Sequence, residues 1–168
     1  KILGYSDAAY GSRQLFQATI LYIFVFALLA SAPLNAVLSR YVSDVIFNET
    51  YSDIMAAFHL GLWISMAIDA IMVVPFAIHE YIVGGVDIVY VVTSVCCFIA
   101  LSLVFYTMLY LSLCKDYGKI SLFYFIGMAI TLGISYIFVN KFNMEITYSM
   151  LLAMTIGFII IASLDMHF

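Results

Sequence analysis

Five apolar segments, each about 20 residues or longer, constrain the fold of this chain more than any other feature of its sequence. About 20 residues of α-helix, at 1.5 Å rise each, cross the ~30 Å hydrocarbon core of a bilayer. Strands of a membrane barrel would instead alternate apolar and polar residues over about ten positions. The sequence therefore predicts an all-α integral membrane protein, a bundle of five transmembrane helices. The predicted spans cover residues 15–38, 54–78, 86–114, 120–139 and 146–164.

The composition excludes a water-soluble fold. Of the 168 residues, 66% are hydrophobic and 10% are charged, and the mean hydropathy is +1.14. Soluble domains are about half apolar and a quarter charged. Six Lys and Arg against ten Asp and Glu leave no basic surface for nucleic acid. The cysteines form neither a Cys-x-x-Cys pair nor a His/Cys cluster, so we interpret them as packing residues and expect no metal and no cofactor.

The connections between the apolar segments are short and carry nearly all the charge, so residues 1–168 are interpreted as a single bundle without a soluble domain. Residues 50–53 fit a helix-capping box, Gly84 and Gly85 predict a turn, and residues 115–119 predict a tight polar turn. The segment 86–114 is longer than a straight span needs, so it should tilt or begin at the membrane surface with Asp87 in water. Basic residues do not decide the orientation, because three lie on each side: Lys1, Arg13 and Lys141 against Arg40, Lys115 and Lys119.

Asp69 is the one carboxylate well inside a predicted span. A charge near the bilayer centre costs at least ~2.5–3.5 kcal/mol, so such a residue usually faces a bundle interior or a watery cavity. We interpret Asp69 as a candidate proton or cation site for ion coupling; the alternative is a neutral carboxyl group bonded to a neighbouring helix. His59 lies ten residues earlier, about 80° around the same helix. The two side chains could line one broad cavity without touching, or His59 could be an ordinary surface group.

The residues after the first span form a polar motif. Arg40 and Asp44 are four apart, so on a continued helix they share a face and can pair. With Tyr41 between them, they could form a polar belt at the cytoplasmic mouth that contacts an anionic substrate or a partner. The alternative is an interfacial cap, in which the arginine side chain extends to water and the tyrosine joins the aromatic belt.

Other intramembrane features indicate helix shape and packing. Pro33 and Pro75 each remove a backbone hydrogen bond, which predicts helix kinks. Gly127, Thr131 and Ser135 recur every four residues, a small-residue stripe typical of close helix packing. No nucleophile elbow, phosphate-binding loop or zinc-protease motif is present, and only Asp69 is deep, so the sequence does not indicate an enzyme.

Two stretches resemble one known family. The run Ala32–Phe47 has a helix ending in a proline, then Arg-Tyr, a small residue and Asp, and Tyr51-Ser52-Asp53-Ile54 follows it. The second stretch, residues 113–120, reads Leu-Cys-Lys-Asp-Tyr-Gly-Lys-Ile. In this order and spacing they resemble PelG, the polytopic subunit of the Pel exopolysaccharide export system, in the superfamily of multidrug, oligosaccharidyl-lipid and polysaccharide flippases.

The resemblance implies a protein of about twelve helices in two lobes, each lobe moving against the other. This chain would then supply spans two to six of the first lobe, with the first helix and the second lobe missing. That agrees with a chain that begins at Lys1 rather than Met and is expected to be a piece of a longer protein. The resemblance also places two segments on the cytoplasmic face: the Arg40–Asp44 turn and the turn containing Lys115, Asp116 and Lys119.

The function implied by the resemblance is flippase-like translocation of a Pel-type polysaccharide, rich in N-acetylgalactosamine-type sugars, across the bacterial cytoplasmic membrane. Its partners would be a cytoplasmic glycosyltransferase and other membrane subunits of the export complex. Two alternatives stay open: a drug or lipid exporter of the same superfamily, and a non-transporting scaffold that recruits a polysaccharide synthase.

Overall fold

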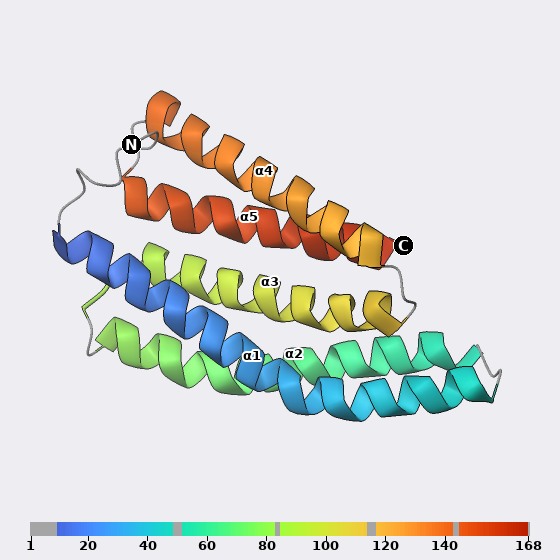
Figure 1. The fold of residues 1–168 in the computed structure, drawn as a ribbon. Helices are drawn as coiled ribbons and strands as arrows, with labels where there is room; N and C mark the ends of the chain where they lie inside the picture. Colours follow the sequence, from blue (N-terminus) through green and yellow to red (C-terminus); the bar gives the residue numbers. More distant parts are fainter. Residues whose placement is uncertain (1–9, 49–51, 83–84, 114–116, 143–144, 168) are drawn as a thin grey trace.

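The computed structural model describes residues 10–48, 52–82, 85–113, 117–142 and 145–167, and within them every regular element is an α-helix. The helices are α1 (Tyr10–Phe47), α2 (Ser52–Ile82), α3 (Ile88–Leu113), α4 (Tyr117–Phe142) and α5 (Ile146–His167) (Figure 1). All five are long and apolar enough to cross a membrane. The predicted all-α bundle of five spans is confirmed.

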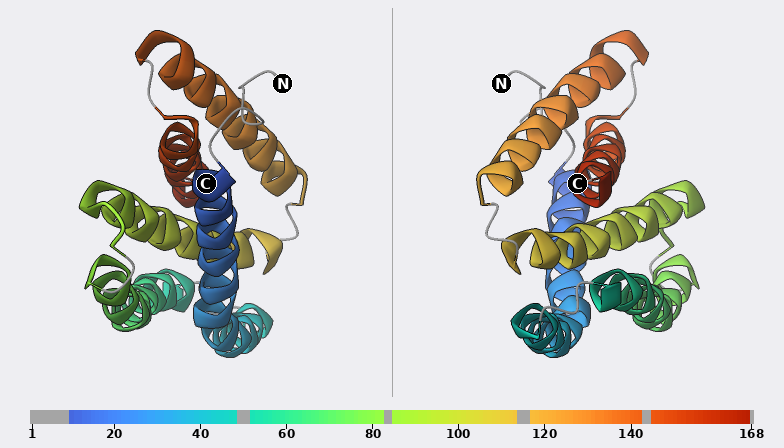
Figure 2. Two further views of the ribbon diagram at one scale, coloured as in Figure 1. Left: turned by 90° about the vertical axis from the view of Figure 1, so that its left-hand side faces the viewer. Right: turned by 90° about the vertical axis from the view of Figure 1, so that its right-hand side faces the viewer.

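Helix α3 is the centre of the bundle. It packs against α1, α2 and α5, whereas α4 packs mainly against the outer side of α5 (Figures 1 and 2). Six of the eleven largest fully buried side chains lie on α3, Tyr106 and Leu101 among them, and the others lie on α1, α2 or α5. Side chains of α3 are therefore the ones best placed to join different helices.

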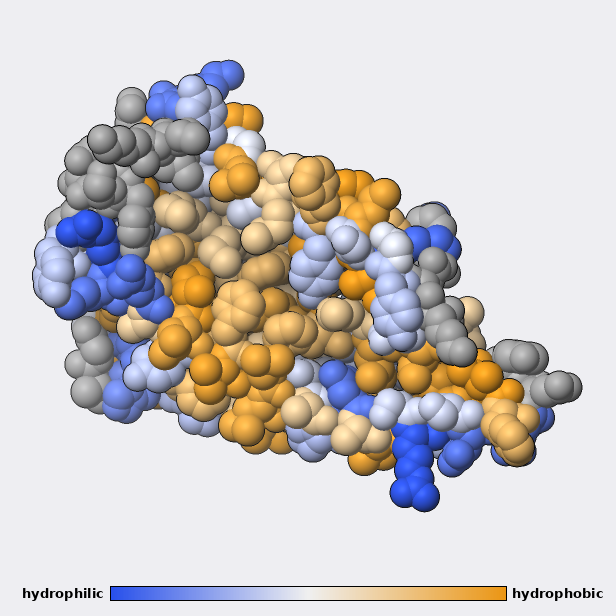
Figure 3. Space-filling view, viewed as in Figure 1, coloured by the Kyte–Doolittle hydropathy of each residue, from blue (hydrophilic) through white to orange (hydrophobic). Residues whose placement is uncertain are grey.

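Successive helices run in opposite directions, so the bundle has two ends (Figure 1). We call the end with Phe47, Leu113, Tyr117 and His167 the first face, and the end with Tyr10, Ile82, Ile88 and Ile146 the second face. Hydrophilic side chains gather toward the two ends, and the surface between them is mainly hydrophobic (Figure 3). Large exposed apolar side chains such as Trp63, Ile71 and Phe125 belong to this middle surface, which suits contact with lipid.

Most helices extend beyond the apolar segments that predict them. The first predicted span, residues 15–38, becomes a helix of 38 residues, because the backbone stays helical through the polar residues on both sides. The third is the exception and is shorter than predicted: α3 begins at Ile88, where the carbonyl of exposed Asp87 accepts a 3.1 Å bond from the Val91 amide. Gly85 precedes it with φ of 61°, the left-handed conformation expected of a turn glycine.

Both prolines lie inside helices. Helix α1 visibly changes direction along its length, where the ribbon passes from dark to light blue (Figure 1). Pro33 is the residue of α1 that cannot donate a backbone hydrogen bond, which gives a physical reason for a bend there. Helix α2 continues through Pro75 to Ile82.

Candidate functional site

The contact between α2 and α3 is built from small and polar residues. On α2, Gly61, Ser65, Asp69 and Val73 are spaced four residues apart and are all buried, so they form one stripe that faces inward. A stripe of this kind lets a neighbouring helix approach closely. It brings polar groups of α3 within hydrogen-bond distance of α2 in the interior of the bundle.

Asp69 lies in the middle of this contact. The residue is 1% exposed, and its Oδ1 accepts a 2.9 Å hydrogen bond from the hydroxyl of Ser102, which is itself fully buried. The other oxygen, Oδ2, is buried and has no hydrogen-bond partner among the residues that the structure describes. A buried carboxylate with an unused oxygen is costly unless that oxygen binds a proton, a cation or water.

One helical turn along α3, Tyr106 makes the second polar contact with α2. Its hydroxyl donates a 2.7 Å hydrogen bond to the backbone carbonyl of Phe58. The hydroxyl fits there because Gly61 has no Cβ; a Cβ at that position would lie 2.5 Å from it. The rings of Phe58, Tyr106 and Tyr110 pack with centroids 4.9–5.6 Å apart. The α2–α3 contact thus combines one buried carboxyl group with an aromatic cluster.

A second buried carboxyl group lies on the other side of α3. Asp165 of α5 is 6% exposed, and its Oδ2 accepts a 3.1 Å hydrogen bond from the hydroxyl of Thr107. The same hydroxyl lies 3.0 Å from the carbonyl of Leu103 and 3.1 Å from that of Val104, so three acceptors share its one hydrogen. Within the described part of the chain, Oδ1 of Asp165 is buried without a hydrogen-bond partner, as Oδ2 of Asp69 is.

The sequence analysis missed Asp165 as a buried carboxyl group, because it considered the position of a residue along a span and not its burial between helices. Asp165 follows the last predicted span and resembles an ordinary end charge. Because α5 continues to His167, the residue stays on the helix and packs against α3. A signal was present: Asp165 continues the buried positions Leu151, Phe158 and Ala162 at helical spacing.

His59 lies on the surface of α2, whereas Asp69 is buried. His59 is exposed, and its Nδ1 lies 2.8 Å from the carbonyl of Met55 one turn earlier on α2. Its ring also contacts Phe58 edge-on, with centroids 5.8 Å apart. This placement matches the surface interpretation of His59. Among the described residues, no group of three or more His, Cys, Asp or Glu is placed to hold a metal ion.

The polar motif after the first span extends from the bundle as part of α1. Arg40, Tyr41 and Asp44 are all exposed, and Arg40 and Asp44 form no ion pair, so the predicted pairing is not seen. An exposed pair of this kind gains only about 0.3–0.5 kcal/mol, too little to hold two long side chains together. Lys119 begins α4 at the same first face, whereas Lys115 and Asp116 lie outside the described residues.

The small residues of α4 pack against α5 as predicted. A Cβ on Gly127 would collide with the side chain of Ile161, and one on Gly157 of α5 would collide with Thr131. Farther along, the hydroxyl of Ser149 donates a 3.3 Å bond to the carbonyl of Ser135. The stripe of Gly127, Thr131 and Ser135 is thus a helix-packing surface.

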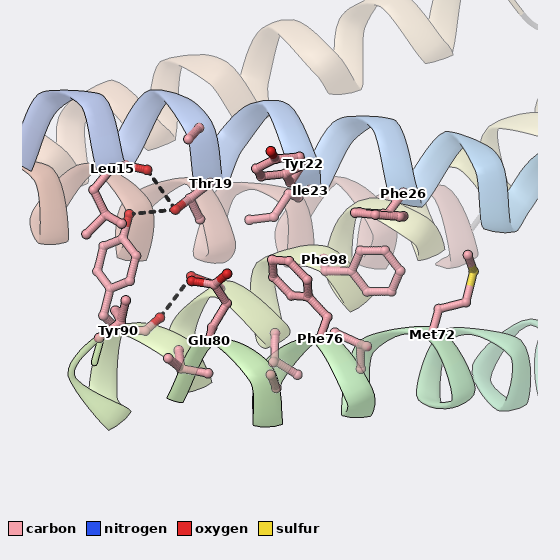
Figure 4. A pocket seen from close by; sticks show the side chains of 17 residues that line it. Leu15, Thr19, Tyr22, Ile23, Phe26, Met72, Phe76, Glu80, Tyr90 and Phe98 are labelled. Atoms are coloured by element: carbon pink, nitrogen blue, oxygen red, sulfur yellow. Dashed lines mark hydrogen bonds between the residues drawn. The ribbon is translucent and has the colours of Figure 1, made fainter. Parts of the chain in front are cut away.

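A separate cavity of about 190 Å³ lies between α1, α2 and α3, toward the second face (Figure 4). Aromatic side chains form much of its wall. The ring centroid of Phe76 lies 6.0 Å from that of Phe26 and 6.3 Å from that of Tyr22. The hydroxyl of Tyr90 donates a 3.3 Å bond to Thr19 across the cavity mouth. Glu80 extends from α2 into the same space (Figure 4).

Comparison with protein families decides the wider identity. The model of the PelG family, described as "Putative exopolysaccharide Exporter (EPS-E)", matches residues 2–168. The chain belongs to the PelG family. This confirms the resemblance drawn from residues 32–47 and 113–120, and it associates the five membrane-capable helices with exopolysaccharide export. PelG is a family of exporters rather than of enzymes. No curated protein and no solved structure gives a significant match.

Proposed function

We propose that this PelG-family chain is part of one lobe of a two-lobed flippase that moves a Pel-type polysaccharide across the bacterial cytoplasmic membrane. The observation that carries the proposal is the family match over residues 2–168, in a bundle of five membrane-capable helices. Alternating access requires two units that move against each other. The second unit and the first helix of this lobe would lie outside this chain.

The polysaccharide would pass along the surface of this lobe rather than through its interior. Buried hydroxyl groups of α3 already have hydrogen-bond partners within the bundle: Ser102 is bonded to Asp69 and Thr107 to Asp165, and Ser94 is bonded to the Tyr90 carbonyl of its own helix. A sugar chain offers many hydroxyl groups and needs aromatic and polar partners that are free to bind it. A passage between this lobe and a second one meets that need without breaking the bundle.

Asp69 is our candidate for ion coupling. Its Oδ2 is buried and has no partner in the described ranges of the chain, and the bond from Ser102 holds the carboxyl group in place. Proton binding at Oδ2 would turn a buried charge into a neutral group that donates a hydrogen bond. Protonation would therefore change the hydrogen bonds that Asp69 can form in the middle of α2. In this way one proton could favour one arrangement of α2 against α3 over another.

The first test compares surface polysaccharide in cells with and without the full-length gene, separating secreted from cell-retained polymer. Loss of surface polymer, with the remaining export machinery present, supports a transport subunit. Unchanged polymer contradicts the proposal and favours a drug or lipid exporter of the same superfamily.

The second test replaces Asp69 by Asn. We expect export to be abolished while the protein level in the membrane is unchanged, because the amide keeps the shape but cannot exchange a proton. Glu145→Gln is the matched control, since Glu145 is an exposed carboxylate at the second face to which no role is assigned. Wild-type export in the Asp69→Asn variant would refute ion coupling by this residue. If Arg40→Ala or Lys115→Ala alone abolished export, a scaffold that recruits a cytoplasmic glycosyltransferase would be favoured.

A further inference from the structure

The cavity between α1, α2 and α3 differs in chemistry along its length. Its deep part is lined by apolar side chains, including Phe26, Met72 and Phe98. Toward the second face it is lined by the hydroxyl groups of Thr19 and Tyr90 and by the carboxylate of Glu80. Glu80 is the only Asp, Glu, Lys or Arg among the lining residues. The cavity is therefore amphipathic, with its negative charge at the membrane surface.

The cavity is also elongated along the helix axes. Its lining on α2 extends from Met72 to Glu80, about 12 Å at 1.5 Å per residue. On α3 it extends from Tyr90 to Phe98, also about 12 Å on the same scale. Helices that cross a bilayer run close to its normal, as lipid acyl chains do. The shape and direction of the space match one acyl chain reaching inward from the second face.

The carboxylate of Glu80 at the mouth of the cavity determines which lipid headgroup would bind there. The side chain of Glu80 is 33% exposed, so part of it is available to a ligand. Its Oε1 lies 3.9 Å from Nδ1 of His79, whose side chain is 65% exposed and does not line the cavity. A primary ammonium group would form a charge-assisted hydrogen bond with the carboxylate, whereas an anionic headgroup would be repelled.

We propose that this cavity binds a bilayer aminophospholipid, such as phosphatidylethanolamine, with one acyl chain between α1, α2 and α3 and the ammonium group beside Glu80. This site is distinct from the buried carboxyl groups and from the polysaccharide passage proposed above. The lipid fills the space between α1 and α2 on one side of α3. Bound lipid would hold these helices together at the second face.

The test uses the full chain, reconstituted in nanodiscs that contain equal amounts of phosphatidylethanolamine, phosphatidylcholine and phosphatidylglycerol with identical acyl chains. After extraction into detergent, mass spectrometry quantifies the lipid that stays bound. We expect phosphatidylethanolamine to be enriched about tenfold over phosphatidylglycerol, the ratio that one charge-assisted hydrogen bond gives. Glu80→Gln should bring that ratio close to one.

Two further variants distinguish the contribution of the Glu80 charge to lipid binding from that of the cavity volume. Glu145→Gln removes an exposed carboxylate at the same second face but outside the cavity, and it should keep the wild-type ratio. Ala77→Phe fills the cavity from α2 and should release all three lipids. Equal retention of the three lipids by wild-type protein, or an unchanged ratio in Glu80→Gln, would overturn the proposal. So would displacement by tetraphenylphosphonium with no lipid preference, which would identify a site for lipophilic cations instead.

Discussion

Ser102 of α3 donates a 2.9 Å hydrogen bond to Oδ1 of Asp69 on α2, near the middle of both helices. Both residues are essentially inaccessible to solvent. The bond therefore joins two helices in the interior of the bundle, and it is the only hydrogen bond of the Asp69 carboxyl group among the described residues. The packing of α2 on α3 and the proposed ion site thus depend on one hydroxyl group.

Ser102→Ala should destabilise the protein measurably. The substitution leaves both oxygens of Asp69 without a donor, and leaving a buried polar group unsatisfied costs about 1–3 kcal/mol. Chemical unfolding in detergent micelles measures the free energy of unfolding. Ser163→Ala is the control, because Ser163 is exposed and its hydroxyl bonds only to its own helix, at the carbonyl of Ile159. A loss no larger than that of the control would show that water replaces the missing donor.

Tyr106 and Gly61 should be energetically coupled. Gly61→Ala places a methyl group against the Tyr106 hydroxyl and 2.9 Å from Leu38 Cδ1, so we expect a loss of about 1–3 kcal/mol. Tyr106→Phe removes the hydroxyl and its bond to the Phe58 carbonyl. In the double variant the methyl group occupies space that the hydroxyl has left. A double-mutant cycle should therefore show the pair to be less destabilised than the sum of its parts by about 0.5–2 kcal/mol. Strict additivity would contradict the close contact.

The glycines of α4 should differ sharply in their response to alanine. Gly127→Ala drives a Cβ into Ile161, so it should lower the free energy of unfolding by about 1–3 kcal/mol and loosen α4 from α5. Gly133→Ala is the matched control on the same helix, because nothing lies within 4 Å of its Cβ position. There, alanine should be neutral or stabilising by up to about 1 kcal/mol, since it favours helix over glycine. Equal effects at the two positions would contradict the α4–α5 packing.

The number and type of the helices could be predicted from sequence because a bilayer demands about 20 apolar residues per span. Their ends could not. Helix α1 continues through Arg40 to Phe47, since an exposed helix satisfies its own backbone hydrogen bonds whether or not its side chains are apolar. Hydropathy therefore marks the part of a helix inside the membrane and not the helix itself.

The candidate site was only half predictable, because hydropathy gives the depth of a residue along a span but not its direction around the axis. Asp69 was found because it interrupts an apolar run. Asp165 was not, since its burial depends on Thr107 of α3, which is distant in sequence. The spacing of Arg40 and Asp44 correctly placed them on one turn of a helix. It did not predict that both side chains would be exposed and unpaired with each other.

The arrangement of the two faces predicts which side chains are labelled from the same side of the membrane. Asp44 and Lys119 lie toward the first face, and Glu145 lies at the second (Figure 1). In a background with its cysteines replaced by alanine, Asp44→Cys and Lys119→Cys should react with an impermeant maleimide from one side, and Glu145→Cys only from the other. If the first face is cytoplasmic, as the resemblance to PelG implies for the Arg40–Asp44 turn, intact cells should protect Asp44→Cys and Lys119→Cys and expose Glu145→Cys. Labelling of Asp44→Cys and Lys119→Cys from opposite sides would contradict the topology itself, because an odd number of spans would then separate them.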